Sequence, residues 1–119
     1  MKIRFEGRAE NAGVVRLAGD LDLLAAPGLR DQFTTIVTAG YRQLVVDMSK
    51  VGSIDSSGLS ALIGGLKVAR VAGGDFRIAV AAAPIRELLR QSSLDAILTP
   101  YRSVEEALAG YNLGRVVAA

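Results

Sequence analysis

Apolar and polar residues alternate at the start of the chain in the pattern of two short strands. Between residues 2 and 8, apolar residues or glycine alternate with charged ones, as in a half-buried or edge strand. A turn at 11–13 then leads into the mostly apolar run 14–18. The pattern predicts that these two strands pair as an antiparallel hairpin.

Four later segments have the signals of helices. Helices are expected after Pro27 and after Pro84, because proline fits the first helical turn, and their apolar residues then recur at helical spacing. A third amphipathic stripe begins at Leu59. A fourth helix is expected at Ser103, which forms a capping box with Glu106 three residues later.

Short apolar runs separate the helical segments and predict three more strands, at 43–48, 76–80 and 96–98. Strand–helix–strand units place neighbouring strands parallel, with right-handed crossovers. We therefore expect an α/β fold, with a mixed, mostly parallel sheet of about five strands and about four helices. A chain of 119 residues has room for one core, so residues 1–119 are expected to form a single domain with a frayed tail at 113–119.

The composition excludes most familiar catalytic chemistry. The chain has no Cys and no His, so it cannot form a thiol nucleophile, a disulfide, a His-based triad or a zinc site from the usual nitrogen and sulfur ligands. We accordingly expect neither a metal, a cofactor nor an enzymatic activity.

Charge and hydropathy also limit the partners. The 14 basic residues are scattered singly and accompanied by only six aromatic residues, so no direct contact with nucleic acid is expected. No apolar run approaches the roughly 18 residues of a membrane-spanning helix, and charged residues interrupt the first eleven positions. A cytoplasmic protein without a membrane partner is the expectation.

The most informative segment lies between the strand expected at 43–48 and the helix that begins near Leu59. There, Asp55, Ser56 and Ser57 fall where unpaired backbone N–H groups and the positive end of the helix dipole converge. Each of the three is a common helix-capping residue, and spacing alone does not distinguish the two adjacent hydroxyls.

Acidic residues cluster in the same part of the sequence pattern. Asp20, Asp22, Asp47 and Asp55 lie in or just after two of the expected strands, so they form one acidic surface if those strand ends meet. Asp22 either orients a partner or organises the turn before Pro27. Asp47 is expected at a strand end, as a solvated acid.

The residues of this segment resemble a known family. The run Ile-Asp-Ser-Ser-Gly-Leu at 54–59, preceded by Leu-Val-Val-Asp-Met at 44–48, is similar to the signature of anti-sigma factor antagonists of the STAS domain family. Similar segments occur at 17–22 and at 83–89, in the family's order. The resemblance covers most of the chain and implies a STAS-type domain.

In such proteins, as the resemblance implies, the serine after the aspartate is phosphorylated by a partner that is both an anti-sigma factor and a serine kinase. That position is Ser56 here. The unphosphorylated form captures the partner and frees a sigma factor, and a separate serine phosphatase restores binding. Phosphate adds roughly 1.5 to 2 negative charges, which would break a packed interface over this residue.

A partner-binding surface is expected around this serine and along the polar face of its helix. Gly58 either lets a partner backbone approach closely or permits a tight first turn. The expected surface comprises Asp20, Asp22, Asp55, Ser57, Gly58, Ser60, Gly64 and Lys67.

Other functions remain open. The chain could be a STAS-type subunit that docks onto a signalling complex or a lipid-transport ATPase without being phosphorylated. An enzyme with Ser56 as nucleophile and Lys67 as base is a further alternative, but eleven helical residues separate the two by roughly 16 Å along the axis. A nucleotide could bind at the helix start, although no glycine-rich phosphate loop precedes it.

Overall fold

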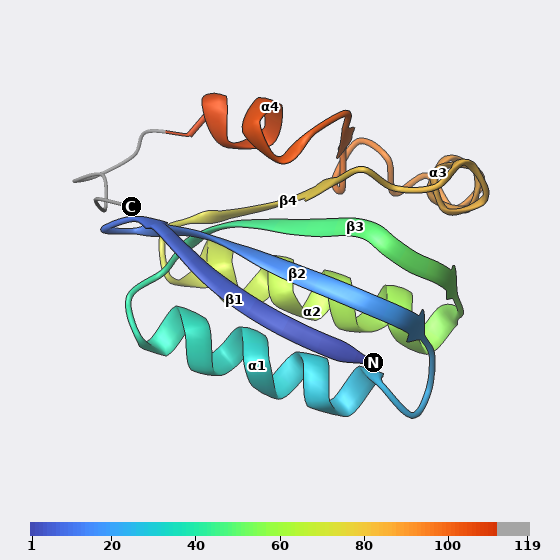
Figure 1. The fold of residues 1–119 in the computed structure, drawn as a ribbon, viewed down its shortest axis with the longest axis horizontal. Coiled ribbons are helices and arrows are strands. Elements are labelled where there is room, and N and C mark those ends of the chain that lie inside the picture. Colours follow the sequence, from blue (N-terminus) through green and yellow to red (C-terminus); the bar gives the residue numbers. More distant parts are fainter. Residues whose placement is uncertain (112–119) are drawn as a thin grey trace.

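The computed structural model describes residues 1–111, which form a five-stranded sheet and four helices (Figure 1). The frayed tail expected at 113–119 lies outside the described residues. The elements in chain order are β1 (Lys2–Ala9), β2 (Ala12–Leu21), α1 (Ala26–Thr38), β3 (Gln43–Ile54), α2 (Ser56–Val71), β4 (Asp75–Ala79), α3 (Ala83–Gln91), β5 (Pro100–Tyr101) and α4 (Val104–Ala109).

The sheet is mixed and mostly parallel, as the sequence predicts. Its strand order is β1-β2-β3-β4-β5, with β1 antiparallel to β2 and the other neighbours parallel. Helices α1 and α2 cover one face, and α4 lies over part of the other (Figure 1). Between α1, α2 and the sheet, the Phe33 and Phe76 rings meet edge to face, 5.1 Å between centroids. None of the helices within residues 1–111 combines the length and apolar character that a membrane crossing needs.

Strands β3 and β5 differ most from the sequence prediction. Strand β3 continues beyond 48 to Ile54, because its polar second half pairs with the end of β2, where Leu21 is the register partner of Ile54. The strand expected at 96–98 is wrong: this segment turns, with the Leu94 carbonyl accepting from two following N–H groups, and β5 forms at Pro100–Tyr101. The apolar character of the 96–98 run reflects burial of Leu98 in the core.

Side chains fix α4 against the sheet. The Tyr111 hydroxyl donates to the Leu44 carbonyl at 2.7 Å, and burial raises the pKa of this phenol, which keeps it a neutral donor. The Arg77 guanidinium lies 4.1 Å from the centroid of the Tyr111 ring and donates to the Ala107 carbonyl at 2.7 Å. These contacts hold α4 over part of its sheet face, and no other helix of residues 1–111 covers the rest of that face.

Candidate functional site

The ends of β2 and β3 meet where α2 begins. Leu21 pairs with Ile54, and the Leu21 carbonyl accepts a hydrogen bond from the Asp55 N–H at 3.2 Å. Since these strands are parallel, their carboxyl ends lie at the same edge of the sheet. The segment after each strand, 22–25 and 55–58, therefore forms one continuous surface.

Asp55 is the residue that caps α2. Its Oδ1 accepts from the Gly58 N–H at 2.9 Å, while its Oδ2 accepts from the Leu23 N–H at 3.2 Å. The first bond satisfies a backbone donor that the helix leaves unpaired. The second bond ties the helix start to the β2–α1 loop, so this one carboxylate positions both sides of the surface.

Replacing Asp55 by Ala is expected to lower the free energy of unfolding by about 1–2 kcal/mol, because the cap and the loop hydrogen bond are both lost. The change is read from the midpoint of urea unfolding. Asp55→Asn keeps an acceptor oxygen for Gly58 and should retain most of the stability. Equal losses in the two variants would contradict the capping role.

Exposure distinguishes the two adjacent serines. Ser56 is the first residue of α2 and is exposed, whereas Ser57 is half-buried. The Ser56 hydroxyl makes no hydrogen bond with any residue of the 1–111 segment. It is therefore an accessible hydroxyl at the positive end of a sixteen-residue helix.

Gly58 is buried by the chain itself. A Cβ atom at this position would lie 2.1 Å from the Leu21 carbonyl oxygen and 2.7 Å from the Leu21 Cγ. The sequence left two roles open for Gly58, a close approach by a partner backbone or a tight first helical turn. In the structure a backbone does approach Gly58 closely, but it is the backbone of β2 in the same chain. Glycine is required here for α2 to sit against the end of that strand.

Two other acids organise the loops beside Ser56. The Asp22 carboxylate accepts from the N–H groups of Leu24 and Ala25 at 3.1 and 3.0 Å, which forms the turn that leads into α1. Asp20 Oδ1 accepts from the Ser53 hydroxyl at 3.0 Å across the ends of β2 and β3. Both acids thus have structural roles at the surface where partner contacts are expected.

Two leucines in the β2–α1 loop are site candidates that sequence reasoning missed. Leu23 is 69% exposed and Leu24 is 90% exposed, and the Leu23 N–H is bound by the helix-capping Asp55. Large apolar side chains that are both adjacent and exposed are typical of a protein contact surface. The sequence did hold one signal that could have identified them. Both leucines precede Pro27, so they do not belong to the helical apolar stripe that follows it.

The remaining predicted contact residues lie along α2. Ser60 Oγ accepts from Arg30 Nη2 of α1 at 3.3 Å, and a Cβ added to Gly64 would lie 4.0 Å from the same arginine's Cγ. Lys67, one turn further on, is exposed. This side of α2 is therefore shared with α1, and Arg30 is a third residue that sequence reasoning missed.

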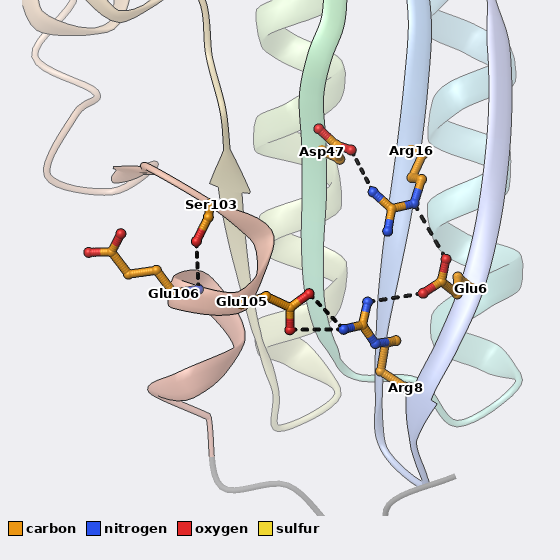
Figure 2. Close-up of polar contacts among 7 residues, drawn as sticks. All are labelled: Glu6, Arg8, Arg16, Asp47, Ser103, Glu105 and Glu106. Atoms are coloured by element: carbon orange, nitrogen blue, oxygen red, sulfur yellow. Dashed lines mark hydrogen bonds and ion pairs between the residues drawn. The ribbon is translucent and has the colours of Figure 1, made fainter. Parts of the chain in front are cut away.

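Asp47 is not the solvated strand-end acid that the sequence suggested. It lies inside β3, only 7% exposed, on the face of the sheet opposite α1 and α2 (Figure 2). Its carboxylate accepts from Arg16 at 2.7 Å and from the Ser49 N–H at 2.9 Å. The prediction failed because β3 continues for seven residues beyond Asp47, to Ile54, which places this acid well inside the strand and far from Asp55.

The way in which the free energy of unfolding changes at acidic pH should reveal the contribution of the ion pair between Asp47 and Arg16. Burial opposes its ionised form, but hydrogen bonds from Ser49 and Arg16 outweigh that effect and lower its pKa below the ordinary 3.8. The contribution is present above the unfolded-state pKa and is lost as pH falls through the lower, folded value. Urea midpoints measured from about pH 6 to about pH 2 should therefore fall less steeply below pH 4 for Asp47→Asn than for the wild type. Parallel curves would refute this linkage.

The structure does not bring Lys67, the base of the enzymatic alternative, next to Ser56. Lys67 lies on the same helix, roughly 16 Å along its axis from Ser56. Among the residues that the structure describes, no three His, Cys, Asp or Glu side chains are grouped as metal ligands. The arrangement instead presents one hydroxyl, a helix start and two exposed leucines on a single surface.

Comparisons with known proteins agree on one family. The family model described as STAS domain matches residues 4–107. The anti-sigma F factor antagonist of Paenibacillus polymyxa is 28% identical over 96 residues, which cover 80% of this chain and 82% of that protein.

Solved structures show the same fold. An anti-sigma factor antagonist from Mycobacterium paratuberculosis superposes with a TM-score of 0.79 at 26% identity, covering 91% of each chain. The Bacillus cell fate determinant SpoIIAA in its phosphorylated form has a TM-score of 0.72 at 20% identity, covering 91% of this chain and 97% of that one. The second likeness is one of fold alone.

Proposed function

Because this chain belongs to the STAS domain family, we propose that it is an anti-sigma factor antagonist whose binding is switched by phosphorylation of Ser56. The unphosphorylated form binds an anti-sigma factor that has serine kinase activity, and this binding frees a sigma factor. Phosphate on Ser56 releases the anti-sigma factor, and a serine phosphatase restores binding. The protein acts as a ligand in this cycle and catalyses none of its steps.

The observation that carries the proposal is the Ser56 hydroxyl at the start of α2, which is exposed and makes no hydrogen bond within residues 1–111. A kinase can reach this oxygen without unfolding any part of residues 1–111. Unpaired backbone N–H groups and the helix dipole favour a negative group at this position. The phosphorylated chain should therefore stay folded, so that modification changes binding and leaves the fold intact.

The surroundings of Ser56 explain how phosphate would disfavour the complex. Leu23 and Leu24 offer exposed apolar area beside the serine, and a partner that buries them removes water from the same surface. A phosphate there introduces roughly 1.5 to 2 negative charges into a packed contact. Asp20 and Asp22 already make the surface around Ser56 acidic. Repulsion between these carboxylates and the phosphate would therefore weaken the complex further.

Capture from the native cell tests this function. Ser56→Ala serves as bait and Ser56→Glu as its matched control, with bound proteins identified by mass spectrometry. We expect a kinase-like anti-sigma factor with the alanine variant alone. Recovery of one partner by both baits would instead support a docking subunit that is not controlled by phosphate.

A further inference from the structure

Within residues 1–111, only α4 packs on the face of the sheet opposite α1 and α2, and it leaves part of that face open. Strand β1 forms one edge of the sheet, and its polar residues Lys2, Arg4, Glu6 and Arg8 alternate onto this open face. The intervening Ile3 packs toward the core on the α1 side.

One half of the open face carries a chain of paired charges (Figure 2). Glu105 of α4 binds Arg8 at 2.8 Å, and Arg8 binds Glu6 at 3.0 Å. Glu6 in turn lies 3.4 Å from Arg16, which binds Asp47 at 2.7 Å. These carboxylates and guanidinium groups satisfy one another from α4 across to β3.

The other half of the face carries cations without such partners. Within residues 1–111, Lys2, Arg4 and Lys50 form no ion pair. They line a hollow of about 440 Å³, and Ala18 lies at its centre because it is the register partner of both lysines. Arg4 also stands directly opposite Arg16, a like-charge pairing that is unfavourable in a sheet.

The outer side of β1 is a free sheet edge. No strand of the described chain pairs with it, so alternate backbone N–H and C=O groups point outward along Lys2–Ala9. Beneath this edge, on the α1 side, Phe5 is 37% exposed and contacts the Tyr41 ring edge to face. The edge thus offers cations on one side and apolar surface on the other.

We propose that β1 binds an extended acidic segment of a partner protein, which adds to the sheet as a sixth strand. In an extended segment alternate side chains repeat about every 6.8 Å, which is the spacing of Lys2 and Arg4 along β1. Acidic residues at every second position then lie over these cations. The intervening residues lie beside Ile3 and Phe5, so the segment alternates acidic and apolar residues.

The charges on β1 select the partner strand. Charged edge residues commonly prevent strand pairing, since a neighbouring strand must approach them closely. Lys2 and Arg4 have no ion-pair partner within residues 1–111. Their positive charge therefore repels a basic strand and attracts an acidic one.

A peptide titration followed by NMR tests the proposal. The ¹⁵N-labelled full chain is mixed with a capped peptide of alternating glutamate and valine, or with its alternating lysine and valine counterpart. We expect saturable shifts along Lys2–Ala9 and slower solvent exchange of the outward β1 amides with the acidic peptide alone. Absence of saturable shifts, or shifts without slower exchange, would overturn strand addition.

Variants separate a specific site from simple charge attraction. Arg4→Gln should weaken binding about twofold to fivefold, as expected for an exposed charge pair. Arg102→Gln removes the same charge after β5, at the opposite edge of the sheet, and should leave affinity unchanged. Equal losses would overturn the proposal.

Backbone methylation of the peptide distinguishes a strand from a bound anion. N-methyl groups on the residues that face β1 should abolish binding, whereas N-methyl groups on the alternate residues should not, because they point away from the pairing edge. Equal affinity of the two methylated peptides, together with displacement by pyrophosphate, would mean that the hollow is an anion site and would overturn strand pairing.

Discussion

Ser56→Glu is expected to weaken binding of the captured anti-sigma factor at least thirtyfold relative to Ser56→Ala, about 2 kcal/mol or more. The glutamate places an unpaired negative charge in the proposed interface, beside the exposed Leu23 and Leu24. Titration calorimetry with the purified partner measures the difference. Because an acid is favourable at a helix N-terminus, the thermal midpoint of the free variant should equal or slightly exceed that of the wild type.

A second variant controls for the chemical change itself. Ser92→Glu introduces the same group at an exposed serine, at the end of α3 rather than at the start of α2. Its affinity for the partner should stay within about twofold of the wild type, the range typical of a surface substitution. If Ser56→Glu bound as tightly as Ser92→Glu, the surface around Ser56 would not be the interface.

Gly58→Ala is expected to lower the free energy of unfolding by about 3 kcal/mol and the thermal midpoint by roughly 10 °C. The new methyl group would overlap the Leu21 carbonyl oxygen, 2.1 Å away, which is backbone and cannot rotate aside. Shifting that carbonyl also disturbs the hydrogen bond that it accepts from Asp55. Differential scanning calorimetry measures the loss.

Gly64→Ala is the matched control on the same helix. Its Cβ would meet only the Arg30 Cγ, at 4.0 Å, so the ordinary helical preference for alanine should raise stability by up to about 1 kcal/mol. Similar thermal midpoints for the two variants would contradict the close packing of α2 against β2.

Local sequence signals located most of the fold. Proline at the first helical turn and apolar residues at helical spacing placed α1 and α3. Gly40, with φ of 107°, lies just past the end of α1, where glycine is common. The segment that contains Ser56 was also recognisable in the sequence, because Asp55 and Ser56 lie between an apolar strand and the amphipathic residues of a helix.

What the sequence did not reveal depends on contacts between distant segments. Asp47 is buried because Arg16 on the neighbouring strand pairs with it, 31 positions away. The exposure of Leu23 and Leu24 follows from the turn that Asp22 organises and from the link to Asp55. Neither outcome is visible in a local pattern of apolar and polar residues.

Phosphate mapping tests the central claim most directly. The purified chain is incubated with the captured anti-sigma factor and Mg-ATP, the site is read by tandem mass spectrometry, and the complex is followed by size-exclusion chromatography. We predict a single phosphate on Ser56, none on Ser57, and dissociation of the complex. An intact complex without phosphate, or a phosphate on Ser57 alone, would contradict the account.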